Sequence, residues 1–338
     1  MSESGKLPVV DQAWLARRTE EILGPDLPII DAHHHIWEMP GFEYRLDDFL
    51  ADLESGHRIE QTVFVQCGYA YRGDGPEALR PVGETERIAA LAEEAAQRGT
   101  MGICAGIVGH ADLTLGEEVT AVLEAHIEAA KGRFRGIRHA LARSDALKRH
   151  LMPPPPEKLA FDPVFRRGFA LLSRFGLSFD AWLFHPQLPE LVDLARAFPD
   201  TPIVVNHLGG PMGIGPYKDR QAEVFATWRS SIRELAHCPN VHIKLGGFGL
   251  SVSGRDFHLA PLPPSSGELA AAWRPYVETC IEAFGAERCM FESNFPVDKS
   301  ACSWPVLWNT CKRLAAAASA EERANLFHDT AARFYRLI

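Results

Sequence analysis

The chain has 338 residues, of which 46% are hydrophobic and 23% charged, a balance typical of a globular protein with a large core. Its 35 basic against 44 acidic residues give a net charge of −9 without a basic cluster, which argues against nucleic acid or an anionic membrane as a partner. Scattered cysteines without Cys-x-x-Cys spacing, and the lack of a signal segment or a membrane-length apolar stretch, predict a cytoplasmic protein with reduced thiols.

Short apolar strands and amphipathic helices alternate along the chain. The strands are expected at residues 28–33, 61–67, 101–108, 134–139, 177–184, 201–206, 240–245 and 287–291. Helices are expected at residues 12–23, 44–56, 84–98, 116–131, 163–175, 187–198, 221–237, 268–284 and 304–318, and from Ser319, where Glu322 completes a capping box. A run of prolines at 153–156 predicts a stiff loop.

Eight apolar strands, each followed by a helix, predict an α/β protein with the (β/α)8 TIM-barrel architecture. An open, doubly wound sheet is the alternative, but no Gly-x-Gly-x-x-Gly follows a strand. No linker, repeat or shift in composition divides the chain. We therefore expect a single barrel domain at residues 28–338, preceded by an N-terminal leader with a short helix at residues 1–27.

The first strand carries a polar cluster at residues 31–35, Asp-Ala-His-His-His. Alternate side chains of a strand point to the same face, so Asp31, His33 and His35 are expected on one face. His34 is expected on the other. Two histidines two residues apart can aim both imidazoles at one metal ion, whereas surface histidines at a polar strand end are the plainer alternative.

Further polar residues follow the later strands, at the end of the barrel where TIM-barrel enzymes place their sites. They are Arg138, His185, His207, Lys244, Glu292 and Asn294. A cluster of buried histidines implies that they satisfy one another or bind something, because an unpaired buried polar group is costly. A single metal ion with an open position fits the set, with His33, His35 and His185 as ligands. His207 is expected close to it.

Several motifs together resemble the amidohydrolase superfamily. They are Asp-x-His-x-His on the first strand, His-Pro after the fifth, Asn-His-x-Gly-Gly-Pro after the sixth and a Ser-x-x-Pro turn after the eighth. The chain is most similar to the amidohydrolase-related branch, which includes fuconolactonase, pyrone-dicarboxylate lactonase and some decarboxylases. The resemblance implies hydrolysis of a lactone, ester or amide with a divalent metal, zinc in the first place. Some lactonases of this branch work without metal, which is the alternative.

The sequence departs from this pattern at Asn294, where the family usually has an aspartate. An amide cannot act as a general base, and it is a weak metal ligand. Strand parity places Glu292 on the same face as Asn294, one layer deeper. We expect Glu292 to meet Lys244 inside the barrel mouth. It would either form a buried ion pair there or activate water, directly or through His207.

Other side chains are candidates for substrate binding. The planar guanidinium of Arg138 can hold a carboxylate in two places, although an ion pair with a neighbouring acid would explain it equally well. Lys244 is placed in the same group. Trp37, Tyr69 and Trp182 could line a pocket for a ring, although buried aromatic residues usually belong to the core.

We therefore expect a hydrolase that opens a lactone, or a related cyclic ester or amide, of a small carboxylated substrate. His207, Glu292 and Asn294 are the expected catalytic residues. The strand-end histidines would act through a divalent metal, preferably zinc, or directly on the carbonyl. A non-oxidative, metal-dependent decarboxylase is the first alternative, and an inactive binding barrel is the second. Small-molecule substrate is the expected partner, and two copies could pair as a homodimer.

Overall fold

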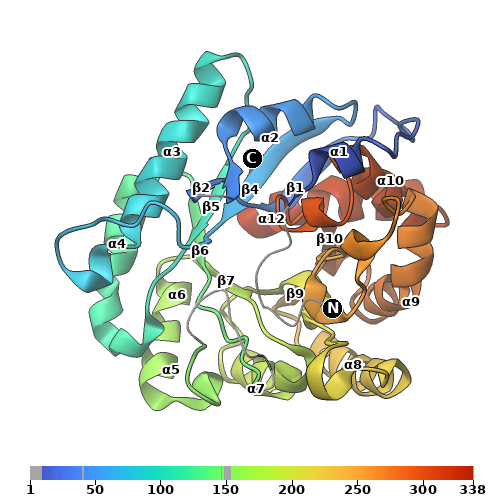
Figure 1. The fold of residues 1–338 in the computed structure, drawn as a ribbon. Coiled ribbons are helices and arrows are strands. Elements are labelled where there is room, and N and C mark those ends of the chain that lie inside the picture. The colour runs from blue at the N-terminus through green and yellow to red at the C-terminus, as the bar shows by residue number, and fades with distance from the viewer. Residues whose placement is uncertain (1–9, 40–41, 146, 148–153, 338) are drawn as a thin grey trace.

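The computed structural model describes residues 10–39, 42–145, 147 and 154–337. Eight parallel strands lie side by side at the centre of the molecule, in the order β1, β4, β5, β6, β7, β8, β9, β10 (Figure 1). Their bounds are Ile29–His34 (β1), Ile59–Val65 (β4), Gly106–Gly109 (β5), Phe134–Ile137 (β6), Ser178–Ala181 (β7), Ile203–Val205 (β8), Val241–Leu245 (β9) and Cys289–Phe291 (β10). The first nine residues of the expected leader and the start of the proline run lie outside the described residues.

Backbone hydrogen bonds join the two ends of this sheet. Asn294 N donates to His33 O at 2.8 Å, and His35 N donates to Phe295 O at 2.7 Å. His34 and Phe295 form a parallel bridge at the same place. The sheet is therefore nearly closed, and the predicted (β/α)8 barrel is confirmed.

Helices surround the strands in chain order (Figure 1). Their bounds are Gln12–Leu15 (α1), Leu46–Leu53 (α2), Val82–Gln97 (α3), Val119–Ala129 (α4), Pro163–Phe169 (α5), Leu171–Arg174 (α6), Leu188–Ala197 (α7), Gln221–Ala236 (α8), Ser266–Phe284 (α9), Trp304–Leu314 (α10), Ala320–Ala324 (α11) and Thr330–Tyr335 (α12). The capping box of Ser319 and Glu322 opens α11 as predicted. Within the described part of the chain, no helix combines the length and apolar character needed to cross a bilayer.

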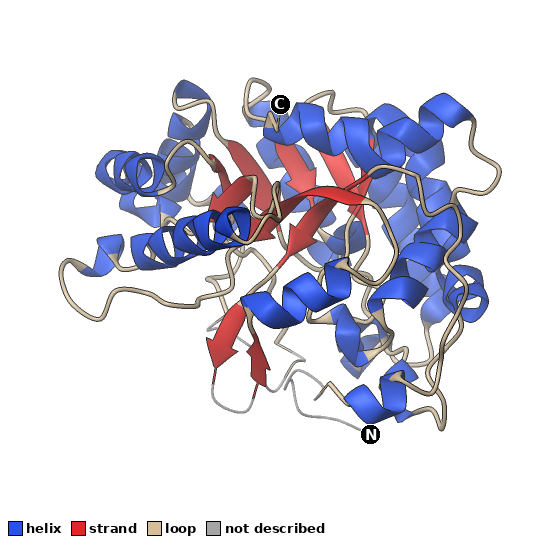
Figure 2. Ribbon diagram, turned by 90° about the horizontal axis from the view of Figure 1, so that it is seen from above, coloured by secondary structure: helices blue, strands red, loops and turns tan. Residues whose placement is uncertain are grey.

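A small antiparallel hairpin, not predicted from the sequence, follows β1. It consists of β2 (Trp37–Met39) and β3 (Phe42–Tyr44). The hairpin stands off one end of the barrel, and the C-terminus lies at the other (Figure 2). The inward strand side chains pack with the C-terminal segment at that other end. The buried members of this group are Ile30, Ala32, Val63, Val65, Val108, Val204, Met290, Ala331, Phe334, Tyr335 and Leu337. Helix α12 thus closes the end of the barrel opposite the hairpin.

The third strand is shorter than predicted. Its expected range was 101–108, but β5 begins at Gly106 and the residues before it form turns. Gly102 and Cys104 have φ angles of +84° and +48°, in the left-handed region that interrupts an extended strand. Ile103 and Cys104 are nevertheless buried, which explains why this apolar run resembles a strand in the sequence.

Replacement of Gly102 by alanine is expected to lower the free energy of unfolding by about 3 kcal/mol. Its Cβ would lie 2.1 Å from the backbone oxygen of Glu60, on a residue whose φ is +84°. Gly99→Ala is the matched control, because Gly99 has φ +90° but no atom within 4 Å of the added Cβ. The control should lose only about 1 kcal/mol. Urea denaturation measures both, and equal losses would show that the contact with Glu60 is relieved without cost.

Candidate active site

His33 and His35 face each other at the end of β1. Their Nε2 atoms are 3.3 Å apart, and both side chains are buried. His35 Nδ1 lies 2.7 Å from the carbonyl oxygen of Val65. Because a carbonyl only accepts, neutral His35 carries its proton on Nδ1 and presents a lone pair at Nε2. His34 points to the other side, as predicted, and stacks on Phe49 of α2.

Asp31 does not share this inward face, contrary to the prediction. Its Oδ1 accepts from Ser293 N at 2.8 Å and its Oδ2 from Ser293 Oγ at 2.6 Å. Burial, and then the negative charge of Asp31, raise the pKa of the Cys311 thiol on α10, outside the barrel. A register shift between Asp31 and His34 interrupts the strict alternation of β1. Asp31 therefore fastens β1 to the chain after β10.

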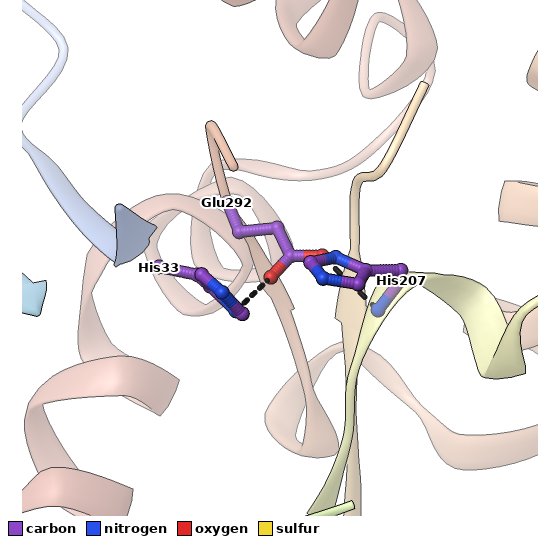
Figure 3. A group of neighbouring side chains, drawn as sticks. All are labelled: His33, His207 and Glu292. Carbon is purple, nitrogen blue, oxygen red and sulfur yellow. Dashed lines mark hydrogen bonds and ion pairs between the residues drawn. The ribbon is translucent and has the colours of Figure 1, made fainter. Parts of the chain in front are cut away.

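Glu292 and His207 form a buried pair beside His33 (Figure 3). Glu292 Oε1 lies 2.7 Å from His207 Nδ1 and also accepts the His207 backbone N–H at 3.1 Å. The other carboxylate oxygen, Oε2, lies 3.0 Å from His33 Nδ1 without reaching hydrogen-bond geometry. In the described part of the chain, these three side chains form the one group of three or more potential metal ligands whose atoms lie within 4.8 Å of one another.

Two glycines after β9 make room for this pair. A Cβ on Gly246 would lie 2.2 Å from Glu292 Cγ. A Cβ on Gly247, whose φ is +72°, would lie 2.6 Å from His207 Cβ. The Gly-Gly sequence at the end of β9 is therefore required by the close approach of both active-site side chains.

Burial controls the protonation of the cluster. It raises the pKa of Glu292 to about 8, although the nearby Lys244 charge favours the carboxylate. Burial and the charge of Lys244 hold the pKa of His33 well below its usual range. Burial and the charge of Arg138 do the same for the pKa of His207. Both imidazoles are therefore neutral at pH 7, so each keeps one unprotonated ring nitrogen.

Arg138 reaches the cluster from the end of β6. Its Nη1 lies 3.3 Å from His33 Nε2, and its Nη2 donates to the carbonyl oxygen of Gln66. The side chain is buried, and its Nε has no hydrogen-bond partner among the described residues. None of the carboxylates in that part of the chain forms an ion pair with it, so the alternative of an ion pair with a neighbouring acid is not found.

Lys244 pairs with Asp180 and not with Glu292, so the predicted partner is wrong. Its Nζ donates to Asp180 Oδ1 at 2.6 Å and lies 3.3 Å from His33 Nδ1. All of these side chains are buried, so the ammonium is not offered to a substrate at the mouth. Asp180 also accepts from Asn206 Nδ2 at 3.0 Å. Asp180 is not among the predicted site residues, although an acid inside the apolar run Leu-Ser-Phe-Asp-Ala-Trp is a signal of a buried polar site.

His185 lies outside the cluster, in contrast to its predicted role as a metal ligand. Met212 N donates to His185 Nδ1 at 3.2 Å. Neutral His185 therefore carries its proton on Nε2 and has no lone pair there for a metal. Its ring packs edge-on against Tyr217, with 4.8 Å between the centroids. Of the three predicted metal ligands, only His33 and His35 lie together.

Asn294 holds a second buried carboxylate. Its φ is +52°, a conformation that asparagine tolerates better than most residues. Its Nδ2 donates to Asp298 Oδ1 at 2.9 Å. Burial raises the pKa of Asp298 to about 8. One of the two N–H donors of the Asn294 amide is therefore engaged with Asp298.

Two of the three predicted aromatic residues flank the cluster. Trp37 stacks on the His35 ring, with 5.5 Å between centroids and 17° between planes. Trp182 meets the His207 ring edge-on at 5.0 Å. The hydroxyl of Tyr69 instead donates to a glutamate of β2 at 3.1 Å, so Tyr69 contacts the hairpin.

Imidazoles, a carboxylate and a guanidinium thus gather where the strands end, which is the position of the active site in (β/α)8 enzymes. The family model described as amidohydrolase matches residues 30–337, and the chain belongs to this family. It is therefore a hydrolase, and the predicted family is confirmed.

Two curated relatives align with nearly the whole chain. The protein y4mH of Sinorhizobium fredii is 33% identical over 335 residues, covering 92% of this chain and 99% of its own. The L-fucono-1,5-lactonase of Burkholderia multivorans is 28% identical over 325 residues, covering 91% and 96%. A solved amidohydrolase from Burkholderia multivorans with bound zinc superposes with a TM-score of 0.69 at 24% identity, covering 92% of this chain and 99% of that one.

Proposed function

We propose that the protein hydrolyses a lactone, with His207 as the general base and Glu292 as the group that orients it. The observation that carries this proposal is the 2.7 Å contact between His207 Nδ1 and Glu292 Oε1. When Glu292 is ionised, it accepts the Nδ1 proton, so His207 Nε2 keeps its lone pair for a proton from water. Relatives named as lactonases support the choice of a cyclic ester.

In the proposed reaction, His207 first accepts a proton and later returns it. A water oxygen attacks the lactone carbonyl carbon while its proton moves to His207 Nε2. The Glu292 carboxylate then stabilises the imidazolium, as a carboxylate does in other histidine-based hydrolases. When the ring C–O bond breaks, His207 returns the proton to the departing oxygen. The product is an open-chain hydroxy acid.

Arg138 is the proposed anchor for a carboxylate on the substrate. Its buried guanidinium has no ion-pair partner among the described carboxylates, and its Nε is unpaired there. A buried cation of this kind is stabilised by an anionic ligand, and a guanidinium matches the geometry of a carboxylate. We therefore favour a carboxylated lactone over a neutral one.

The histidine pair suits a divalent cation. Zn–N bonds of about 2.0–2.1 Å place two nitrogens of a tetrahedral site about 3.4 Å apart. The separation of His33 Nε2 and His35 Nε2 is 3.3 Å, and His35 presents a lone pair there. His33 and His35 would hold the ion. A bound zinc ion would polarise the lactone carbonyl.

The proposal is tested with purified protein on sugar-acid lactones and on carboxylated pyrone-type lactones. Release of acid is followed in a pH-stat, and the ring-opened product is identified by mass spectrometry. Metal content is measured before and after chelation, which separates a metal-dependent from a metal-free reaction. Release of carbon dioxide from an aromatic acid, with every lactone left intact, would replace the proposal by decarboxylation.

The rate is expected to rise with pH between about pH 7 and 9. Glu292 has a raised pKa of about 8, so it is protonated below that pH and becomes the required carboxylate above it. Glu292→Gln should remove this rise, because glutamine does not ionise. The measurement is kcat/KM against pH in buffers of constant ionic strength. A wild-type profile that is flat across this range would contradict the assignment.

A further inference from the structure

We propose that Tyr335, the last residue of α12, positions the active site through Asp180 and Lys244. The Tyr335 hydroxyl lies 2.9 Å from Asp180 Oδ1 and 3.1 Å from Oδ2, inside the closed end of the barrel. Tyr335 touches none of the reacting groups, so its role is to hold those that do. The inference rests on the proposed lactone hydrolysis, because one of its two readouts is that reaction.

Asp180 is the centre of this arrangement. It is fully buried in β7 and accepts hydrogen bonds from three side chains, Tyr335, Lys244 and Asn206. A buried carboxylate with several donors has one favoured orientation, because each lost hydrogen bond would leave a polar group unpaired. Asp180 therefore fixes the positions of all three partners.

Two of these partners, Lys244 and Asn206, adjoin residues of the active site. Lys244 Nζ lies 3.3 Å from His33 Nδ1, on the side where His33 faces Glu292. Asn206 immediately precedes His207 in the chain. The two imidazoles on either side of Glu292 are thus both supported from Asp180. Removal of one hydrogen-bond donor from Asp180 should therefore change the positions of both imidazole rings.

The hydroxyl of Tyr335 can be separated from its ring. The ring lies beneath the Lys244 ammonium, with 5.2 Å between Nζ and the ring centroid, and packs with Phe334. Tyr335→Phe keeps these ring contacts and removes only the donor to Asp180. Thr330→Val is the matched control on the same helix, because the Thr330 hydroxyl is also buried but donates to the Ala286 carbonyl oxygen.

The first readout is independent of activity. Imidazole nitrogen signals of the full-length, ¹⁵N-labelled protein are recorded by NMR, and the His33 signal is assigned by its loss in His33→Gln. Tyr335→Phe should shift the His33 signals, whereas Thr330→Val should leave them in place. If His33 does not respond to Tyr335→Phe, the proposal is overturned, whatever the substrate proves to be.

The second readout is the kinetics of lactone hydrolysis. Tyr335→Phe should lower kcat about tenfold and leave KM within about twofold, because a small misplacement of reacting groups slows the reaction without weakening binding. Thr330→Val should leave both constants unchanged. Equal kcat losses in the two variants would assign the effect to a loosened α12 and overturn the proposal. A shifted His33 signal in a protein that hydrolyses no lactone would reject the proposed function and retain the positioning role.

Discussion

Glu292→Gln is expected to lower kcat/KM for lactone hydrolysis about 10³-fold, within the range for loss of acid–base catalysis. Glutamine has nearly the same shape and can still bond to His207 Nδ1. It carries no negative charge, so it cannot stabilise the imidazolium that forms when His207 takes a proton. The fold should persist, because the side chain is replaced without creating a cavity. Steady-state kinetics and thermal unfolding measure the two effects.

Glu84→Gln is the matched control for this substitution. Glu84 on α3 is also a buried glutamate, and burial raises its pKa to about 7. It accepts backbone N–H groups of Cys67 and Tyr69 and makes no contact with the pair of His207 and Glu292. Its variant should retain kcat/KM within about threefold, since loss of surrounding hydrogen bonds alone does not remove acid–base catalysis. Near-normal activity of Glu292→Gln would exclude Glu292 from the mechanism.

Asp180→Ala is expected to lower the free energy of unfolding by about 3–5 kcal/mol, because it leaves a buried ammonium without its partner. Lys244 is fully buried and its Nζ lies 2.6 Å from Asp180 Oδ1. The loss is measured from urea denaturation curves, with the slope compared between variants to confirm that the folded states are alike. Secondary structure should be unchanged at low urea.

The double variant Asp180→Ala, Lys244→Met is the control for this prediction. A buried ion pair that is replaced by apolar side chains often has little net effect on stability, whereas a broken pair is costly. The double variant should therefore recover most of the stability lost by Asp180→Ala. If it is no more stable than the single variant, the loss comes from the cavity or from Tyr335 and Asn206, not from the unpaired charge.

The fold could be predicted because strands buried on both faces leave a strong local pattern. Each expected strand has a counterpart in the barrel, and the capping box at Ser319 is in place. The errors arise where local backbone conformation overrides the apolar pattern. The left-handed residues Gly102 and Cys104 shorten the third strand, and a register shift turns Asp31 away from His33.

The candidate site was only partly readable from the sequence. The alternation of side chains along each strand correctly predicts that His33, Glu292 and Lys244 point into the barrel, because this alternation depends only on neighbours along the chain. The partners across the barrel depend on the stagger between strands, which no local pattern specifies. Lys244 therefore received the wrong partner. Tyr335 could not be found at all, because only the packing of α12 brings it to Asp180.

The barrel closes where β1 pairs with the chain after β10, and this closure also determines when the active site can form. His33 leaves the ribosome long before Glu292, because 258 residues separate them in the chain. A growing chain can form many of its helices before that moment, but it cannot assemble the pair of His207 and Glu292 against His33. The enzyme therefore becomes active only after the last strand of the barrel has been synthesised. A nascent fragment stalled before the last strand would lack Glu292 and would be inert.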